Sequence, residues 1–314
     1  MKPALRLHRD LDRLPAAARG TVAAIGNFDG VHLGHRAVLA AAAEIAARQG
    51  AALSVVTFEP HPRRFFKPDA PPFRLASLRR KFELLAQCGV AHVFALRFNA
   101  ALAAHAAEAF VDEILLAKLD LAGIVAGYDF AFGRGRGGTS QTLADALHAA
   151  GREALIVAPA RTPGAEIYSS TAVRNALKAG DVSSAAALLG RPFSVDGRVR
   201  HGDKRGRTIG FPTANLALGA CLPPAYGVYA VRVAGAVAGS LVGGVANLGV
   251  RPTVGGDAAP RLEVHLFDFD GDLYGRRLQV AFEAFLRPER KFADFAALKS
   301  QIAADANAAR ARLG

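Results

Sequence analysis

The sequence predicts an α/β protein of two domains, a doubly wound parallel sheet followed by a small antiparallel β-barrel. Three observations support this prediction. Short apolar runs alternate with helical stretches through the first half of the chain, which is typical of a parallel sheet with helices on both faces. After the breaker Gly190-Arg191-Pro192 the pattern changes to short strands separated by Gly and Pro, as in a compact barrel. The 314 residues suit two domains of roughly 150 each, and we place them at 1–187 and 188–314.

Strands of the first domain are expected at the apolar runs Thr21–Ile25, Leu53–Phe58, Val90–Leu96, Ile124–Ala126 and Ala154–Ala158. Helices are expected between them, at Arg36–Gln49, Leu78–Cys88, Ala104–Leu116 and Ser140–Ala150. Nucleotides bind beyond the carboxyl ends of the strands in such folds. The loops that follow these strands are therefore the places where we expect a site.

The second domain shows a run of short β-patterns and one long helix. Its strands are expected at Phe193–Val199, Val228–Val233, Leu241–Asn247, Leu262–Phe267 and Gln279–Leu286. The helix is expected at Phe292–Leu313. Apolar residues recur there at helical spacing, which indicates a packing face that includes Phe292, Phe295, Leu298 and Ile302.

Composition is that of an ordinary globular protein, with 51% hydrophobic and 21% charged residues. The two cysteines, Cys88 and Cys221, form neither a metal-binding spacing nor a CxxC pair, which favours buried thiols in a reducing compartment. The first twenty residues carry Arg and Asp and lack the apolar core of a signal peptide. We therefore expect a cytoplasmic protein without a membrane segment.

Basic residues outnumber acidic ones by 39 to 27, which gives a formal net charge of +12 and a pI near 10.3. Such an excess suits an anionic partner, either a nucleic acid or a phosphorylated small molecule. Composition alone does not separate these two classes, so the placement of the motifs has to decide.

The segment from Gly26 to His35 follows the first expected strand and begins the first expected helix. Its two histidines, His32 and His35, would stand beside the free N–H groups of a helix start, where phosphates are favoured. Glycines 26, 30 and 34 let the backbone approach a phosphate without a clash from Cβ. The segment therefore predicts a cradle for a triphosphate.

A second phosphate clamp is expected from Glu166–Arg174. Hydroxyls at positions 169 to 171 can cap a helix, and Arg174 lies one turn inside it. Alone this pattern is an ordinary helix start, but beside the histidine motif it indicates a group that stabilises charge on a leaving pyrophosphate.

Four segments of the first domain together resemble the FMN adenylyltransferase module of prokaryotic FAD synthetases, within the nucleotidyltransferase superfamily. They are GNFDGVHLGH at 26–35, TFEPHP at 57–62, GYDFAFG at 127–133 and YSSTAVR at 168–174. The resemblance implies that His32 and His35 bind ATP phosphates and that Arg174 closes over them. Further ATP contacts implied by the resemblance come from Gly26, Phe28, Gly34, Ser170 and Thr171. The flavin and adenine contacts it implies come from Phe58, His61, Pro62, Asp129 and Phe132.

A Gly-rich basic stretch, 200–216, is the densest motif of the second domain. It lacks the GxxxxGK[ST] pattern of a P-loop, yet its backbone N–H groups and basic side chains can wrap phosphates. Thr213 and Asn215 are two apart, so both face one side of an extended segment, and their oxygens suit Mg²⁺. Glu263 lies on an alternating strand, where a carboxylate is more often simply solvated.

This domain resembles the riboflavin kinase module in the order and content of its segments, which include GDKRGRTIGFPTANL, PAYGVYAVRV, GVANLGVRPTV, LEVHLFDF and FLRPERKF. The resemblance implies that Thr213 and Asn215 hold Mg·ATP and that Glu263 is the catalytic base. From the Gly-rich basic stretch itself, ATP contacts are expected at Gly202, Lys204 and Arg207. Asn247, Arg251 and the Arg287–Lys291 stretch would lie near the flavin or the phosphate.

Together the two resemblances predict an ATP-dependent enzyme that phosphorylates riboflavin to FMN and then adenylylates FMN to FAD, with Mg²⁺ and release of pyrophosphate. The expected partners are riboflavin, FMN, FAD and ATP, with no nucleic acid and no membrane, and the oligomeric state is left open. One alternative is a nucleic-acid-binding protein, suggested by the pI and by the basic Gly133–Gly138 stretch. Another is an enzyme in which only one half is catalytic.

Overall fold

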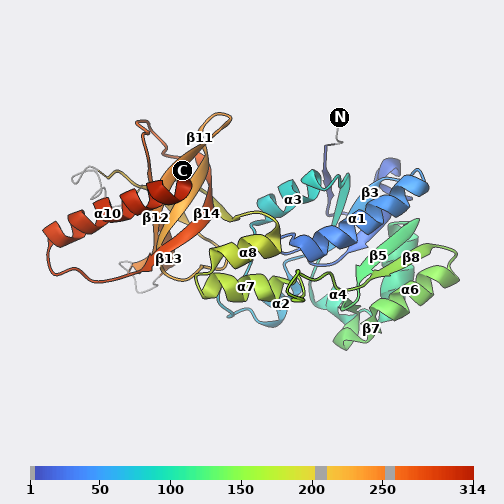
Figure 1. Ribbon diagram of the computed structural model, residues 1–314. Coiled ribbons are helices and arrows are strands. Elements are labelled where there is room, and N and C mark those ends of the chain that lie inside the picture. The colour runs from blue at the N-terminus through green and yellow to red at the C-terminus, as the bar shows by residue number, and fades with distance from the viewer. Residues whose placement is uncertain (1–3, 202–210, 252–258) are drawn as a thin grey trace. The chain divides into compact units, whose positions relative to one another are not determined.

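The computed structural model describes residues 4–201, 211–251 and 259–314, and these form two compact units (Figure 1). Unit 1 consists of Met1–Ala70 and Leu78–Tyr168, and unit 2 of Pro71–Ser77 and Ser169–Gly314. Because residues 169–187 belong to unit 2 in this division, it differs from the predicted boundary between 187 and 188. The boundary between the two functional domains stays a prediction.

Unit 1 is built on a six-stranded sheet in which all neighbouring strands are parallel. The strands are β1 (Arg6–His8), β2 (Val22–Ile25), β3 (Leu53–Glu59), β4 (His92–Arg97), β5 (Gly123–Gly127) and β8 (Glu153–Val157). They lie in the order β1-β4-β3-β2-β5-β8, so the chain winds one way from β2 and the other way from β5. The predicted doubly wound parallel sheet is confirmed. Strand β1 was not predicted.

Helices cover both faces of this sheet because alternate strand residues enter two different cores. Val22 and Ala24 pack in a cluster with residues of α1 (Leu33–Arg48) and α3 (Leu78–Gln87). Ala23 and Ile25 pack in another cluster with residues of η2 (Phe110–Lys118) and α6 (Ser140–Ala149). Side chains that alternate in direction along a strand produce this three-layer arrangement.

Short elements complete unit 1. They are η1 (Ala16–Ala18), α2 (Pro62–Phe66), α4 (Ala100–Ala104), α5 (Ala107–Ala109), η3 (Arg134–Arg136) and a hairpin of β6 (Ala131–Phe132) and β7 (Gly138–Thr139). The single helix predicted at Ala104–Leu116 is wrong at its start, because His105 and Ala106 are extended and separate α4 from α5. From Phe110 the chain continues as the π-helix η2.

Unit 2 contains a six-stranded antiparallel sheet that closes almost completely into a barrel. Its strands are β9 (Phe193–Arg198), β10 (Ala214–Ala217), β11 (Gly227–Val237), β12 (Ser240–Arg251), β13 (Ala259–Leu266) and β14 (Arg277–Pro288). The order is β10-β13-β12-β11-β14-β9, and a bridge between Arg200 and Asn215 joins the two ends. The predicted small antiparallel barrel is confirmed, although β10 was not among the predicted strands.

Among the described residues of unit 2, three helices accompany the barrel: α7 (Ser170–Lys178), α8 (Val182–Leu189) and α10 (Phe295–Leu313). Helix α10 lies across the barrel strands in Figure 1, with Ala306 and Ala309 in a cluster that includes Val228 and Val245. The prediction that Phe295 belongs to the packing face is wrong, since that side chain is 62% exposed. Across the described ranges, none of the helices has the length and apolarity that crossing a membrane requires.

Candidate active sites

The loop between β2 and α1 lies where the strand order of unit 1 reverses, which is the position at which open α/β sheets bind ligands. Two non-glycine residues of this loop have left-handed backbones, Phe28 with φ 49° and Val31 with φ 44°. Such conformations cost free energy and persist only where the surroundings impose them. The loop is therefore held in one specific shape beside the start of α1.

His32 and His35 are brought together at that helix start. The backbone N–H of His35 donates to Nδ1 of His32 at 3.3 Å, so His32 is the N-cap of α1. A neutral His32 that accepts at Nδ1 carries its proton on Nε2, where the proton can be donated to an anion. The two rings stack with centroids 3.6 Å apart, and the Phe28 ring lies 5.1 Å from that of His35.

Gly34 is required between the two histidines because no side chain fits there. A Cβ atom at this position would lie 2.7 Å from the backbone oxygen of Tyr168 and 3.1 Å from the His32 ring. Gly26 is less constrained, since a Cβ there would be in ordinary contact with the Phe28 ring at 3.4 Å.

The predicted flavin contacts of unit 1 lie in two different environments. Phe58 and Phe132 are only 8% and 7% exposed and belong to one core cluster, where Phe58 packs against Phe98. His61, Pro62 and Asp129 are more accessible, and His61 is the N-cap of α2. Packing in the core is therefore sufficient to explain the aromatic residues at two of these five positions, Phe58 and Phe132, without a flavin contact.

An exposed aromatic surface directly after His61-Pro62 was not predicted. Phe66 is 65% exposed, and its ring contacts those of Phe65 and Phe98 at centroid distances of 5.2 and 5.7 Å. The rings meet edge to face, and the exposed ring of Phe66 suits contact with a flat aromatic ligand. The signal in the sequence was the Arg-Arg-Phe-Phe run at 63–66, where two aromatic residues stand in a basic segment.

Residues 169–174 of the predicted second clamp belong to unit 2, whereas residues 166–168 and the two histidines belong to unit 1. Ser169 caps α7 by accepting from the N–H of Ala172, and Ser170 and Thr171 are the first residues inside the helix. Arg174 donates from Nε to the backbone oxygen of Phe73 at 2.9 Å, with its guanidinium carbon 5.7 Å from the Phe73 ring centroid. A joint site of these residues with the histidines stays a prediction.

Three polar residues form a row across the barrel of unit 2. Asn215 on β10 is directly opposite Glu263 on β13, and Glu263 is directly opposite Asn247 on β12. Opposite residues of an antiparallel sheet point to the same face and lie close enough to interact. Asn215 is only 8% exposed and donates from Nδ2 to the backbone oxygen of Thr213 at 3.4 Å. The strand register therefore brings Asn215 and Glu263 together, although they are 48 positions apart in the sequence.

A pocket of about 480 Å³ lies beside this row and includes Thr213 in its lining. Other lining residues supply carboxylates and an aromatic ring: they include Asp270, Asp272 and Tyr274. The Tyr274 ring is in contact with that of His201, with centroids 3.9 Å apart. Thr213 therefore lines the pocket two residues before Asn215, the residue opposite Glu263. The predicted ATP contacts Gly202, Lys204 and Arg207 lie outside the described residues.

Arg287 is occupied by an ion pair. Its Nε and Nη2 donate to the two oxygens of Asp305 at 2.9 and 2.7 Å. Both side chains are largely buried, with 19% of Arg287 and 8% of Asp305 exposed. Arg287 is opposite Val228, which is in turn opposite Asn247, so it continues the row of Asn215, Glu263 and Asn247. Its predicted contact with a flavin or a phosphate remains a prediction.

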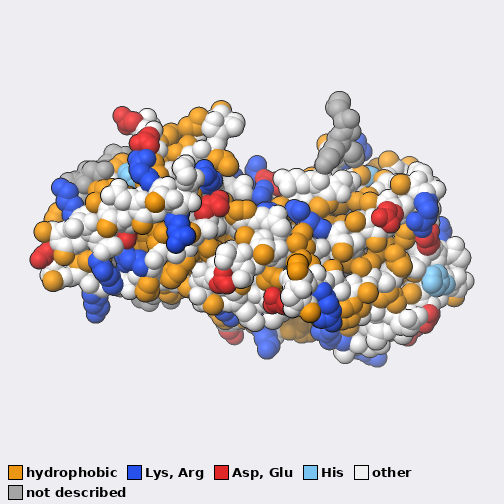
Figure 2. Space-filling view, viewed as in Figure 1, with side chains coloured by type: hydrophobic (Ala, Val, Ile, Leu, Met, Phe, Trp, Pro, Cys, Tyr) orange, Lys and Arg blue, Asp and Glu red, His pale blue; other side chains and the backbone are white. Residues whose placement is uncertain are grey.

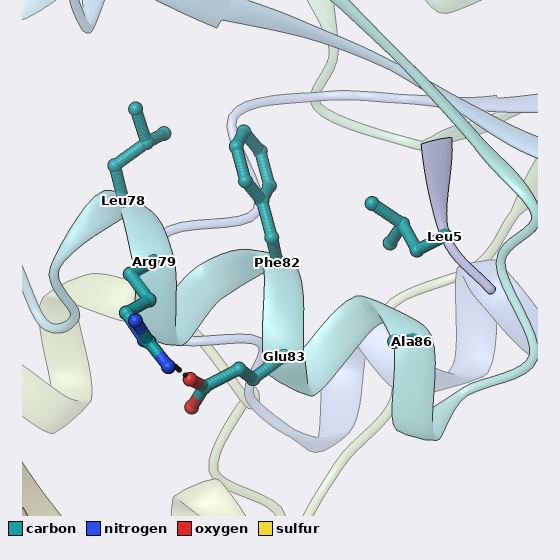
Figure 3. Close-up of a pocket in the computed structure, with 6 residues that line it drawn as sticks. All are labelled: Leu5, Leu78, Arg79, Phe82, Glu83 and Ala86. Carbon is teal, nitrogen blue, oxygen red and sulfur yellow. Dashed lines mark hydrogen bonds and ion pairs between the residues drawn. The ribbon is translucent and has the colours of Figure 1, made fainter. Parts of the chain in front are cut away.

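Another hollow, of about 620 Å³, lies on the outer side of α3 (Figure 3). Leu78 and Phe82 of that helix and Leu5, which precedes β1, line it, and the Arg79–Glu83 ion pair at 2.9 Å is at its edge. None of the predicted site residues lines this hollow. Within the described part of the chain, no cluster of three or more His, Cys, Asp or Glu residues is arranged to hold a metal ion.

Taken together, a loop with two histidines at the switch point of a doubly wound sheet and a polar row on a small antiparallel barrel are features of a nucleotide-dependent transferase. Family models agree with this division: one described as FAD synthetase matches residues 14–172, and one described as riboflavin kinase matches residues 189–313. The chain belongs to the bifunctional riboflavin kinase/FMN adenylyltransferase family, and it makes FAD from riboflavin by way of FMN, using ATP.

Relatives in two species match almost the whole chain. The bifunctional riboflavin kinase/FMN adenylyltransferase of Pseudomonas fluorescens is 48% identical over 310 residues, which cover 98% of this chain and 97% of that protein. The protein of the same description from Escherichia coli K12 is 43% identical over 311 residues, which cover 99% and 98%. Among solved structures, a Streptococcus pneumoniae protein described as a macrolide-efflux protein has a TM-score of 0.86 and 30% identity, with 98% of both chains covered.

Proposed function

We propose that the loop from Gly26 to His35 binds the triphosphate of ATP during adenylyl transfer. The observation that carries this proposal is the position of the two stacked histidines at a helix start, at the switch point of the sheet. An oxygen of the FMN phosphate attacks the α-phosphorus, the bond from that phosphorus to the bridging oxygen breaks, and pyrophosphate leaves. Donors on His32 and His35, together with the helix N–H groups, stabilise the negative charge that develops on the phosphate oxygens.

Further contacts for this reaction are proposed from the remaining motifs. Ser170, Thr171 and Arg174 supply donors and a positive charge for the phosphates, and the bond from Arg174 to the backbone of Phe73 supports a defined direction for its guanidinium. The accessible residues His61, Pro62 and Asp129 border the flavin, with Phe58 and Phe132 supporting this wall from the core. Phe66 adds an exposed ring for the isoalloxazine.

For the kinase reaction, we propose that Glu263 accepts the proton of the riboflavin 5′-hydroxyl as its oxygen attacks the γ-phosphorus of ATP. A bond forms between that oxygen and the phosphorus, the bond to the β-phosphate oxygen breaks, and ADP leaves. The pocket of about 480 Å³ beside Thr213 offers room for the nucleotide. Asn247 on the adjacent strand, and Arg287 further along the row, lie on the side where we place the flavin.

Mg²⁺ is proposed as the metal ion of the kinase site. The oxygens of Thr213 and Asn215 are hard donors of the kind it prefers, and the Glu263 carboxylate is opposite Asn215. Few protein ligands suffice, since Mg²⁺ commonly retains waters and substrate phosphates. When bound, the ion neutralises charge on the phosphates.

The excess of basic residues is proposed to serve two ATP sites and anionic FMN rather than a nucleic acid, in a cytoplasmic enzyme. On the face shown in Figure 2, Lys and Arg side chains are scattered among acidic and apolar ones instead of forming one stripe. A nucleic-acid-binding surface would instead produce steeply salt-dependent affinity. Binding of a labelled single-stranded RNA measured between low and physiological salt tests this: affinity that rises steeply as salt falls would favour the nucleic-acid alternative.

Two substitutions test the assignment of the two sites. His35→Ala is expected to lower FAD formation from FMN by roughly 10²–10³-fold, while FMN formation from riboflavin continues. Glu263→Gln is expected to lower FMN formation by roughly 10²–10⁴-fold, while added FMN is still converted to FAD. Chromatography of the flavins over time measures both rates. Matched controls are His148→Ala, an exposed histidine of α6, and Glu283→Gln on β14 of the same barrel. Loss of both activities in both variants would contradict the assignment of two separate sites.

A further inference from the structure

Lys81 on α3 is a buried cation beside the loop from Gly26 to His35. Its side chain is 5% exposed, and its Nζ donates to three oxygens: the backbone oxygen of Asn27 at 3.0 Å, Oγ1 of Thr57 at 3.0 Å and Oε1 of Glu59 at 3.1 Å. Lysine is rarely buried to this extent unless its charge is paired. Each of its three protons has an acceptor here, so the ammonium is held in one position.

The ion pair with Glu59 accounts for the charge of Lys81 but not for its bond to the loop. The Glu59 side chain is 14% exposed, so the two opposite charges largely cancel each other within the protein. The bond to the Asn27 oxygen is additional. That oxygen also accepts from the Thr57 hydroxyl at 3.3 Å, so one donor from α3 and one from β3 bind the same peptide oxygen.

This peptide group joins Asn27 to Phe28, the residue with φ 49° in the loop. In a trans peptide the C=O and the N–H point in opposite directions. When Lys81 and Thr57 hold the Asn27 oxygen on the side of α3 and β3, they also set the direction of the Phe28 N–H. A left-handed conformation at Phe28 is unfavourable by itself, so a fixed peptide before it helps the loop to keep its shape.

We propose that Lys81 is a positioning residue for adenylyl transfer, which orients the Asn27–Phe28 peptide so that the loop binds the triphosphate of ATP without rearrangement. The inference rests on the proposed role of this loop in ATP binding. Because Glu59 cancels most of its charge, Lys81 acts through orientation rather than through attraction of the phosphates. Its loss is expected to raise the KM for ATP in FAD formation and to leave FMN formation unchanged.

Two variants separate positioning from a merely structural ion pair. Lys81→Met removes the ion pair with the largely buried Glu59, so the stability of the fold is expected to fall and the KM for ATP to rise. The double variant Lys81→Met/Glu59→Gln removes both charges and is expected to recover most of the lost stability. If Lys81 positions the loop, the double variant keeps a KM for ATP raised by roughly tenfold, because the bond to Asn27 is still missing.

A second pair of variants leaves both charges in place. Thr57→Val removes the other donor to the Asn27 oxygen, whereas Thr57→Ser retains it. We expect Thr57→Val to raise the KM for ATP in the same direction as the double variant, by about threefold or more, and Thr57→Ser to stay near wild type. Lys118→Met serves as the control, because it breaks an exposed ion pair with Asp12 on the same unit.

The measurements are the KM for ATP and kcat of FAD formation from added FMN, the rate of FMN formation in the same chain, and thermal unfolding. A wild-type KM for ATP in the double variant overturns the inference. If the double variant does not fold, a wild-type KM in Thr57→Val overturns it instead. His35→Ala is measured in parallel. An unchanged rate of FAD formation in that variant would contradict the proposed role of the loop in ATP binding, and not only the role of Lys81.

Discussion

Substitution of Gly34 tests the histidine loop, residues 26–35. The size of the expected effect follows from two distances. A Cβ atom there would lie 2.7 Å from the Tyr168 backbone oxygen, closer than atoms of this kind approach, and 3.1 Å from the His32 ring. In Gly34→Ala the start of α1 must therefore shift or the His32 ring must move. Overpacking of this kind costs about 1–3 kcal/mol, and the higher helix propensity of Ala returns up to about 1 kcal/mol.

The expected loss of stability in Gly34→Ala is thus only about 0–2 kcal/mol, so the protein should fold. The effect on FAD formation should be much larger, because displacement of a positioned group by about 1 Å can lower a rate roughly 10²-fold. FMN formation should not change. The assay follows both flavin products from riboflavin and from FMN, together with a denaturant titration. Gly164→Ala is the control, since a Cβ there has only one neighbour, at 3.8 Å.

A rate of FAD formation within about twofold of wild type in Gly34→Ala would refute this reasoning. The close approach of Tyr168 and the position of His32 would then have no bearing on the reaction. Equal losses of FAD and FMN formation would also count against it, because the substitution would have acted through the folding of the whole chain.

Three further predictions concern pH, the barrel ion pair and the metal ion. His8 and His92 share a hydrogen bond at 2.9 Å, and burial, the largest cause, lowers the pKa of both imidazoles from 6.5. Because both pKa values are lower in the folded state, the unfolded chain binds more protons than the folded one just below pH 6.5. The urea concentration at the unfolding midpoint of unit 1 should therefore fall as the pH drops below that value. His92→Leu should weaken this pH dependence. Asp305→Ala leaves the largely buried Arg287 without its carboxylate and should destabilise the barrel by about 3 kcal/mol, measured by denaturant unfolding. Chelation of Mg²⁺ should stop FMN formation, and its return should restore the rate, which a flavin chromatogram records.

Each of these predictions has a contrary outcome. An unfolding midpoint that stays constant from pH 7 to pH 5 would show that the histidine pair is not linked to folding. For the ion pair, the control is Arg310→Met, which breaks the exposed pair with Asp268, and an equal effect of the two substitutions would contradict the role of burial. A kinase rate unaffected by chelation would remove the argument for Thr213 and Asn215 as metal ligands.

Local sequence patterns were sufficient to predict most elements of the fold. Strand β3 was expected at Leu53–Phe58 and is found at Leu53–Glu59, and helix α6 was expected at Ser140–Ala150 and ends one residue earlier. Periodicity of apolar residues and helix caps are properties of neighbouring residues, so they can be recognised in the chain itself. Where the apolar pattern was short, as in β1 and β10, the prediction missed the strand. Those strands exist because they pair with β4 and β13.

The position of the histidine loop was also predictable, because His32 and His35 follow an apolar run and begin a helical one. Other parts of the sites were not. Asn215, Glu263 and Asn247 come together only through strand register, and nothing in their local sequences specifies which residues will be opposite one another. The same holds for Lys81, which the sequence presents as one charge among many on a helix.

The chain by itself determined the class of protein: two domains, the strand-loop-helix that carries the two histidines, and the family motifs of both halves. Tertiary structure alone decided the order β1-β4-β3-β2-β5-β8, the packing of Phe58 and Phe132 in a core, and the bond from Lys81 to Asn27. The physical reason is the range of the interactions. Helix periodicity and capping act between residues a few positions apart, whereas sheet order, burial and buried ion pairs depend on segments that meet only when the chain has folded.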